Sequence, residues 1–428
     1  MLTSMPATIN RRHFKCAIVL GLIIVLFGVI HCTRQIPGDS LKEPALIFKS
    51  KCSKCHSIDR ALLATKDEVA WRQTIISMSQ KQGSEITQDE IEKLVHFHKE
   101  RQKKEQELFY RDCGQCHAPG LSLAKAKPPA EWRTTIKRML AKRPGEGGEE
   151  DIELLISYHL REQRLKFSRM LEAAGLKEKE RQAAEVFVEA CSTCHDLQRA
   201  LTAVKDETAW RQTITAMAQK QGSPVKKDEV EGLVRFHVRR QEMEQEIFKQ
   251  KCAACHPAER ALEKIKTQDE WRETIRRMAA KAPGQITDDQ VDLLINFHKR
   301  TERENERFFR GKCTACHNLE TALSTTGDRQ LVEKTIVFMI EKAGKSISYD
   351  EVKRLIDFHN ERQKEEESLF NKDCTICHPA EWALEKKKTR EEWRDTIRRM
   401  QGKAPELISD DAIDYLVSYH IRKSRGLQ

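Results

Sequence analysis

The sequence predicts an all-α protein built from six tandem repeats. The first observation is an internal period: a five-residue motif begins at positions 52, 113, 191, 252, 313 and 374, so every step except the second has the same length. The second is the helical spacing of apolar residues within each repeat, as in Trp71, Ile75 and Met78. The third is a run from Ile91 to Cys113 that is rich in glutamate and lysine and contains neither proline nor glycine.

Each repeat is expected to contain three helices. The first carries a phenylalanine four residues before the motif: Phe48, Phe109, Phe187, Phe248, Phe309 and Phe370. The second has the sequence Trp-Arg-x-Thr-Ile-x-x-Met in five repeats. The third begins, in the fourth repeat, after Thr287, a suitable N-cap residue. Because nothing interrupts the run from Ile91 to Cys113, we expect the last helix of one repeat to continue as the first helix of the next.

The period sets the expected domain boundaries. An N-terminal signal or membrane anchor with a tether covers 1–43, and an inserted segment, expected to be a bend or an additional helix, covers 165–181. The six repeats cover 44–104, 105–164, 182–243, 244–304, 305–365 and 366–428. The first and third repeats share one pattern around the tryptophan, and the second, fourth and sixth share another. This alternation indicates a block of two repeats that occurs three times.

The periodic motif is Cys-x-x-Cys-His, which is typical of covalent c-type haem attachment. Its cysteines are Cys52, Cys55, Cys113, Cys116, Cys191, Cys194, Cys252, Cys255, Cys313, Cys316, Cys374 and Cys377. Its histidines are His56, His117, His195, His256, His317 and His378. One helical turn directs both sulfurs to the porphyrin edge, and the next residue brings its imidazole to the iron. The sequence therefore predicts six covalently bound haem c groups.

Two other uses of paired cysteines do not explain this pattern. A zinc site needs two pairs on one metal, or one pair with a His-x3-5-His segment, and neither requires a histidine after every second cysteine. A thioredoxin-like redox pair is expected near a βαβ pattern, which the sequence lacks. Six copies, using twelve of the fourteen cysteines, favour haem.

The formal charge of +10 raises the question of nucleic acid or anionic lipid as a partner. Six haems would add about twelve propionate charges and bring the ferrous protein to about −2, so the basic residues mostly offset the cofactor. No lysine or arginine cluster with interleaved aromatic residues is present. We therefore expect no nucleic-acid binding.

The N-terminus indicates export. Arg11, Arg12 and Lys15 precede an apolar run over residues 16–30, whose length suits a signal peptide or a short membrane span. No small-x-small cleavage site follows, and the sequence around Cys32 weakly resembles a lipoprotein box. The expected location is the periplasmic side of the cytoplasmic membrane, through an uncleaved anchor or a lipidated Cys32.

Two further residues recur at fixed intervals after each motif and are candidates for the sixth iron ligand. A methionine follows every motif histidine at the interval that separates His56 from Met78: Met78, Met139, Met217, Met278, Met339 and Met400. A late histidine follows at the interval that separates His56 from His98: His98, His159, His237, His298, His359 and His420. Methionine ligation raises the reduction potential and histidine ligation lowers it. Core packing by the methionine, or a hydrogen-bonded structural histidine, would also explain these positions.

The repeats resemble very small class I cytochrome c domains, through the phenylalanine before the first cysteine, the haem helix and the distal methionine. The interval from tryptophan to methionine is similar to that in the haem domains of quinohaemoprotein amine dehydrogenase. This resemblance implies that the methionine is the sixth ligand, and that an aromatic residue of the last helix packs on the phenylalanine. The chain departs from it in two ways: the late histidine stands where the family has leucine, and Val332 replaces the tryptophan of the fifth repeat.

The expected function is electron transfer along a row of haems outside the cytoplasmic membrane. Two filled axial positions leave no site for a substrate, so the chain is expected to be an electron carrier and not an enzyme. Its expected partners are other redox proteins or a respiratory complex, with the membrane contacted through the N-terminal segment. The alternatives are a multihaem reductase or peroxidase with one open iron, for which the fifth repeat is the candidate, and an electron-storage or scaffold subunit.

Overall fold

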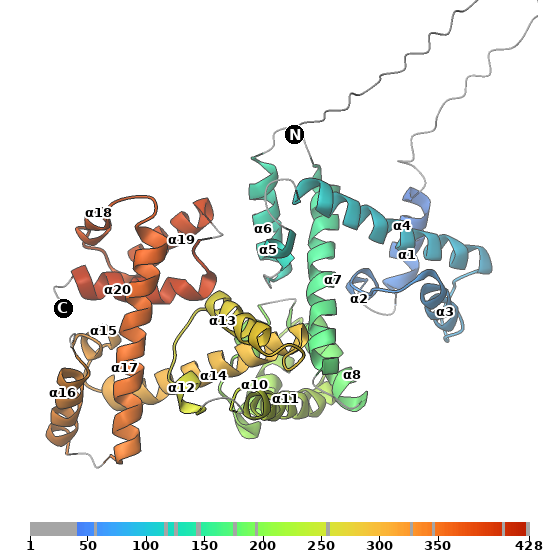
Figure 1. The fold of residues 1–428 in the computed structure, drawn as a ribbon. Helices are drawn as coiled ribbons and strands as arrows, with labels where there is room; N and C mark the ends of the chain where they lie inside the picture. Colours follow the sequence, from blue (N-terminus) through green and yellow to red (C-terminus); the bar gives the residue numbers. More distant parts are fainter. Residues whose placement is uncertain are drawn as a thin grey trace, which may run out of the picture.

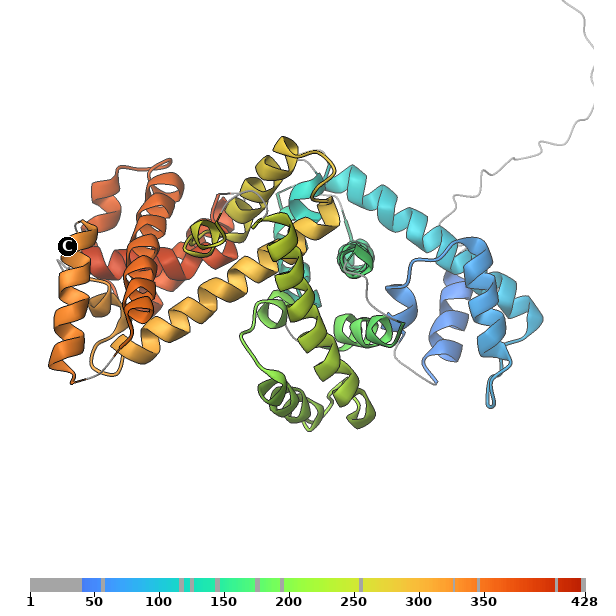
Figure 2. The ribbon, with the colours of Figure 1, turned by 60° about the horizontal axis from the view of Figure 1, so that its bottom comes forward.

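The computed structural model describes residues 41–54, 58–114, 119–123, 127–142, 147–173, 178–192, 196–253, 257–325, 328–344, 347–404 and 407–424. Every regular element within these ranges is helical and none is a strand, so the all-α prediction is confirmed. The helices form an elongated array, with α1 (Lys42–Cys52) near one end and α20 (Ile413–Ser424) at the other (Figure 1, Figure 2). This arrangement follows the order of the repeats.

The tryptophan and methionine of each repeat share one helix. These helices are α3 (Glu68–Ser79), α6 (Pro129–Leu140), α10 (Glu207–Ala218), α13 (Gln268–Lys281), α16 (Arg329–Lys342), which has valine in place of the tryptophan, and α19 (Arg390–Lys403). Local sequence fixes where several of them begin. The side chain of Asp67 accepts a hydrogen bond from the backbone N–H of Ala70 at 2.7 Å, and Thr267 and Glu270 form a capping box at the start of α13.

Long helices connect successive repeats. They are α4 (Gln88–Asp112), α7 (Glu149–Ala173), α11 (Val230–Lys251), α14 (Asp288–Cys313) and α17 (Tyr349–Leu369). α4 runs without a break across the boundary at 104/105 to the second motif, as the absence of proline and glycine predicts. α14 begins directly after Thr287, which is its N-cap residue. The helices α4, α11 and α14 thus lead directly into the next motif, and α17 does so through a short turn that ends at Cys374, whereas α7 ends at Ala173, before the third motif.

Short elements complete the described chain. Single turns lie close after each motif: α2 (Asp59–Leu62), α5 (Pro119–Leu123), α9 (Gln198–Leu201), α12 (Glu259–Leu262), α15 (Leu319–Ala322) and α18 (Ala380–Leu384). Two π-helical turns lead to motifs, η1 (Phe187–Cys191) and η3 (Phe370–Cys374). There are two 3₁₀ turns in the described chain. The turn η2 (Lys227–Glu229) precedes α11, and η4 (Asp410–Ala412) precedes α20. These short turns leave most of the packing surface to the longer helices.

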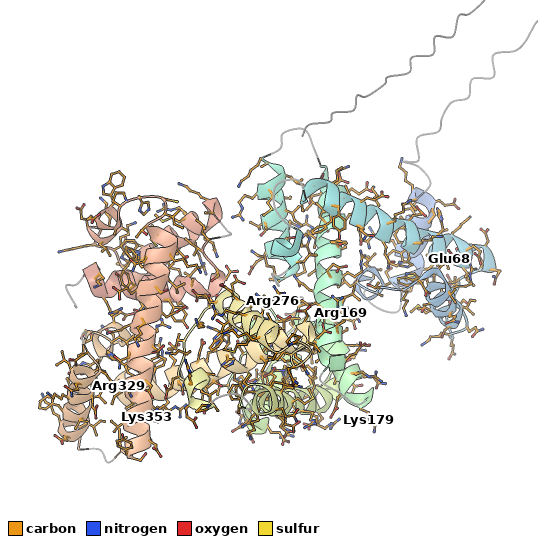
Figure 3. The ribbon with its side chains drawn as sticks, viewed as in Figure 1. Glu68, Arg169, Lys179, Arg276, Arg329 and Lys353 are labelled. Atoms are coloured by element: carbon orange, nitrogen blue, oxygen red, sulfur yellow. The ribbon has the colours of Figure 1, made fainter. Side chains whose placement is uncertain are left out.

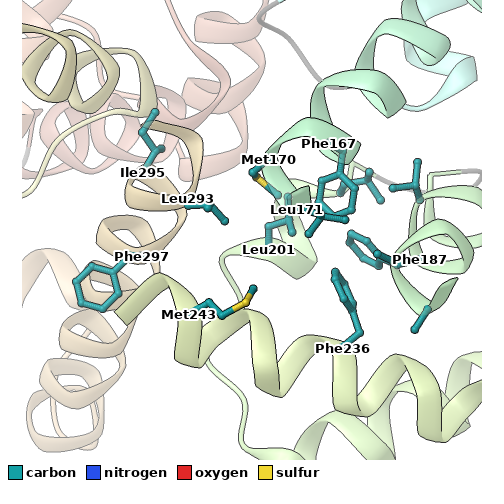
Figure 4. Close-up of a cluster of buried hydrophobic side chains, with 14 of the residues drawn as sticks. Phe167, Met170, Leu171, Phe187, Leu201, Phe236, Met243, Leu293, Ile295 and Phe297 are labelled. Atoms are coloured by element: carbon teal, nitrogen blue, oxygen red, sulfur yellow. The ribbon is translucent and has the colours of Figure 1, made fainter. Parts of the chain in front are cut away.

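The inserted segment 165–181 is mostly helical. It extends α7 to Ala173 and supplies the start of α8 (Glu178–Val186). In this part of α7, Phe167, Met170 and Leu171 pack into the apolar cluster of the third and fourth repeats, near Phe187 and Phe236 (Figure 4). The insertion thus joins the first pair of repeats to the second.

A buried aromatic pair recurs in every repeat. The phenylalanine before the motif packs on the aromatic residue that precedes the late histidine, with ring centroids 4.5–5.4 Å apart. The partners are Phe97, Tyr158, Phe236, Phe297, Phe358 and Tyr419. Such pairs contribute about 0.5–1.5 kcal/mol beyond their buried area. The contact implied by the family resemblance is therefore present, and it holds the first helix of each repeat against the third.

Three buried Arg–Glu–Arg triads join the repeats in pairs. In each triad a glutamate of the connecting helix binds an arginine one turn earlier and a second arginine on the next long helix. The triads are Arg101–Glu105–Arg161, Arg240–Glu244–Arg300 and Arg362–Glu366–Arg422. All three glutamates are fully buried. Three equivalent triads agree with a two-repeat block that occurs three times.

Charged side chains also connect the fourth and fifth repeats at the surface. Lys353 of α17 binds Asp357 on its own helix at 2.8 Å and Glu263 of the fourth repeat at 2.5 Å. Arg329 of α16 binds the same Asp357 at 2.6 Å. Figure 3 labels Arg329 and Lys353, which lie on the neighbouring helices α16 and α17. Asp357 itself is buried, whereas Lys353 and Glu263 are partly exposed, and an exposed ion pair such as Lys353–Glu263 contributes about 0–1 kcal/mol. The buried triads therefore matter more to how the repeats are held.

None of the helices within the described ranges has both the length and the apolar composition needed to cross a membrane. The apolar run over residues 16–30, on which the predicted anchor depends, lies outside those ranges, as does Cys32.

Candidate functional site

The predicted attachment residues are described completely in the fifth and sixth repeats. Helix α14 ends at Cys313, and the following turn carries Cys316 and His317. In the sixth repeat η3 ends at Cys374, which is buried, and Cys377 and His378 follow in the same kind of turn. In the first four repeats the second cysteine and the histidine, namely Cys55, His56, Cys116, His117, Cys194, His195, Cys255 and His256, lie outside the described residues.

The fifth repeat encloses a cavity of about 520 Å³ that gathers the predicted site residues. Cys313, Cys316 and His317 line it from the motif side, and Met339 and His359 line it from α16 and α17. Apolar side chains such as Phe309 and Leu355 form much of the remaining wall. Two thiols, a motif imidazole, two candidate distal ligands and an apolar wall are the donor set and environment that a covalently bound haem requires.

A second cavity of about 520 Å³ lies between the first repeat and the region of α7 and α8, from which Arg164, Leu165, Ser168 and Glu185 line it. The described residues that line it include Cys52, Trp71 and Met78, whereas His98 is not among them. The indole nitrogen of Trp71 is buried and has no hydrogen-bond partner among the described residues. Because a buried donor without an acceptor is costly, a haem propionate near this ring would fit the site.

All six late histidines are buried, with at most 4% of the residue surface exposed. Burial, with a smaller contribution from Arg101, lowers the pKa of His98 to about 3. Burial likewise lowers the pKa of His159, His359 and His420 to about 4. These imidazoles are therefore neutral near pH 7, the protonation state in which a histidine can bind a metal.

In five repeats the tryptophan covers the late histidine. The two rings lie 3.8–4.0 Å apart between centroids, and in four of these pairs they are stacked within 12° of parallel. The pairs are Trp71–His98, Trp132–His159, Trp210–His237, Trp271–His298 and Trp393–His420. In these repeats the histidine is packed between an indole face and the ring of the phenylalanine before the motif, which approaches it edge-on.

The predicted methionines are less buried than the histidines. Met78, Met139, Met217 and Met400 are half-buried, whereas Met278 is 37% exposed and Met339 is 43% exposed. None of the six belongs to the fully buried part of the four apolar clusters. Met78 and Met339 line the two cavities. Met400 packs against the edge of the apolar cluster of the last two repeats, so core packing explains part of its position, but it does not explain Met78 and Met339 at the cavities.

The buried triads and the covering of histidine by tryptophan were not predicted from the sequence. The triads had a detectable pattern, because each glutamate lies seven residues after a late histidine and the second arginine lies two residues after the next one. The ring stacking had no detectable sequence pattern, because the tryptophan and the histidine belong to different helices. Only the packing of those helices brings the two rings together.

Comparisons with known proteins add no relative. No protein-family model matches the sequence, and no similar chain was found among curated proteins or among solved structures. The motif and the geometry of the repeats are therefore the basis for assigning a function.

Proposed function

We propose that the protein is a hexahaem c-type cytochrome that transfers electrons along a row of covalently bound haems on the outer side of the cytoplasmic membrane. One observation carries the proposal: a single cavity of the fifth repeat is lined by both motif cysteines, the motif histidine and two candidate distal ligands. A bound haem c supplies a one-electron iron couple. Six equivalent motifs would give six such centres in one chain.

The residues of each repeat have distinct roles in this proposal. The two cysteines hold the porphyrin edge by thioether bonds, and the motif histidine binds the iron on one side. A residue of the distal wall binds on the other side, so that no substrate position remains. Phe309 of the buried aromatic pair forms part of the apolar cavity wall, where it would shield a bound haem from water.

The connecting helices suit a row of fixed centres. The helices α4, α11, α14 and α17 each carry a late histidine at or before the middle of the helix, and each leads into the next motif. The triads then fix the angle between neighbouring long helices. Electron transfer between cofactors requires such fixed positions, and the expected partners are redox proteins or a respiratory complex that exchange electrons with the row.

Haem content tests the proposal directly. The full chain, produced with the cytochrome c maturation system, is expected to bind six haems that remain attached after denaturation, as measured by the pyridine haemochromogen and by intact mass. Replacing both motif cysteines of the sixth repeat (Cys374→Ala and Cys377→Ala) is expected to reduce the number to five. Fewer than six haems in the unmodified chain, or zinc at the thiols, would refute the proposal.

Binding of an external ligand separates the carrier from the alternative enzyme. A reductase or peroxidase needs an iron with an open sixth position, and such an iron binds carbon monoxide in the ferrous state. We expect no carbon monoxide binding at neutral pH. Stoichiometric binding to one haem of the six would instead support a catalytic site.

A further inference from the structure

The fifth repeat lacks the tryptophan that covers the late histidine. Val332 occupies the position and is fully buried in α16. Valine is much smaller than tryptophan and cannot cover an imidazole ring, so the environment of His359 differs from that of the other five late histidines.

The ring of His359 is also turned. In the other five repeats the phenylalanine before the motif and the late histidine lie 4.9–5.4 Å apart and meet at 78–88°. Phe309 and His359 lie 6.2 Å apart and meet at 50°. The imidazole therefore occupies a different orientation where the indole is missing.

The two cavities also differ in whether the late histidine lines them. In the first repeat Trp71 lines the cavity and His98 lies behind it, whereas in the fifth repeat His359 lines the cavity together with His317. The Nδ1 atom of His359 is buried and has no hydrogen-bond partner among the described residues. The Nδ1 atoms of His237 and His420 share this property, but an indole covers each of those rings. Of these three histidines, His359 is the one that lines a described cavity, so a group bound in that cavity can complete its contacts.

Met339 lines the same cavity but is the more exposed of the two candidate ligands in the fifth repeat. It is 43% exposed, against 37% for Met278 of the fourth repeat, so exposure by itself does not distinguish the two methionines; the difference is that in the fifth repeat His359 lines the same cavity. A thioether that remains accessible to water must lose side-chain freedom before it can bind iron, whereas the buried imidazole is already fixed.

From these contacts we infer that His359, and not Met339, is the sixth iron ligand in the fifth repeat, so that one of the six haems has two histidine ligands. In the first repeat Trp71, and not His98, lines the cavity, and we extend this arrangement to the other repeats that keep the tryptophan, where the methionine would be the ligand. This inference rests on the proposed function, because it requires a haem in each repeat. Since histidine ligation lowers the potential relative to methionine, the fifth haem would have the lowest potential of the row.

Near-infrared magnetic circular dichroism of the oxidised six-haem protein tests the inference, because it distinguishes His/Met from His/His iron. We expect five His/Met centres and one His/His centre. Met339→Ala is expected to leave this ratio unchanged. The matched variant Met278→Ala in the fourth repeat is expected to remove one His/Met centre, about one fifth of that signal.

The histidine variants complete the test. His359→Ala is expected to abolish the His/His signal, whereas His298→Ala is expected to leave all five His/Met centres in place. Six His/Met centres in the unmodified protein, or loss of one in Met339→Ala, would overturn the inference while six haems would still support the proposed function. Because Met339 is partly exposed, its variant is expected to fold even if a histidine variant does not. A haem count below six would instead count against the function itself.

Discussion

The indole ring of Trp71 lies on the imidazole ring of His98, with 3.8 Å between the ring centroids and 7° between the planes. The same contact occurs in four more repeats and is absent from the fifth, where Val332 takes the place of the tryptophan. This contact distinguishes the two cavities: His98, which has it, does not line the cavity beside its repeat, whereas His359, which lacks it, lines the cavity of the fifth repeat. It therefore connects one residue of the sequence with the proposed properties of one haem.

Removing a covering tryptophan should change the iron ligand. Trp71→Val is expected to expose His98 to the cavity of the first repeat, so that one His/Met centre becomes His/His. Loss of the buried indole is also expected to cost about 3 kcal/mol of stability in that repeat. Magnetic circular dichroism and thermal unfolding measure the two effects.

The reverse change provides the control for this prediction. Val332→Trp is expected to cover His359 and to convert the fifth centre from His/His to His/Met. If Trp71→Val retained its methionine ligand at full haem content, covering by tryptophan would not be what selects the ligand.

The buried triads should be essential to stability. Glu244 lies between Arg240 and Arg300, and Glu244→Gln would leave two buried guanidinium groups without a counter-charge. We expect a loss of about 3–5 kcal/mol, measured by chemical denaturation.

A matched variant lies on the same helix. Glu246 is exposed and pairs with Arg239 at 3.5 Å, so Glu246→Gln is expected to change stability by less than about 0.5 kcal/mol. Equal effects of the two substitutions would show that the triads do not hold the repeats together.

The contact between the fourth repeat and the last two should weaken as pH rises. Burial, together with a hydrogen bond to Glu270 and its negative charge, raises the pKa of Glu365 well above its usual value of 4.5. Burial opposes ionisation of Glu270, but hydrogen bonds from Glu365 and Thr267 outweigh it and lower its pKa. Lys266, Lys372, Glu302 and Asp373 are further charged groups that interact with this pair.

The sign of the pH effect follows from proton binding. Between pH 4.5 and the raised pKa, the folded protein holds a proton on Glu365 that the unfolded chain releases, so stability falls as pH increases through this window. Glu365→Gln is expected to reduce this dependence, and Glu367→Gln, at an exposed position, to leave it unchanged. Unfolding curves from pH 5 to 9 measure the slope, and an unchanged slope in Glu365→Gln would contradict the assignment.

Protein without haem should be less ordered than the haem-bound form. A single repeat is short enough to bury only a thin core, and the cavities of about 520 Å³ interrupt it. We expect the chain made without haem attachment to lose helix content and cooperative unfolding. Far-ultraviolet circular dichroism and thermal melts measure both, and a fully helical, cooperatively melting apoprotein would show that the polypeptide supplies its own core.

Local sequence patterns were sufficient to predict much of the fold. The uninterrupted run from Ile91 to Cys113 indicated a continuous helix, and α4 spans nearly all of it. Thr287 indicated the start of α14. These features depend on interactions between residues a few positions apart, which the sequence lists in order. The sequence does not show whether the inserted segment is a bend or a helix, because the packing of Phe167 and Met170 on another repeat is a long-range contact.

By itself, the sequence determined the number of repeats, the predicted thioether and histidine positions, and the two residue types that compete for the distal side. Covalent attachment needs residues that are close in the chain, and such spacing is visible in any sequence. The tertiary structure decided which side chain reaches the cavity. Trp71 and His98 come from different helices, and the ring that covers the imidazole was recognisable only after α3 and α4 were packed together.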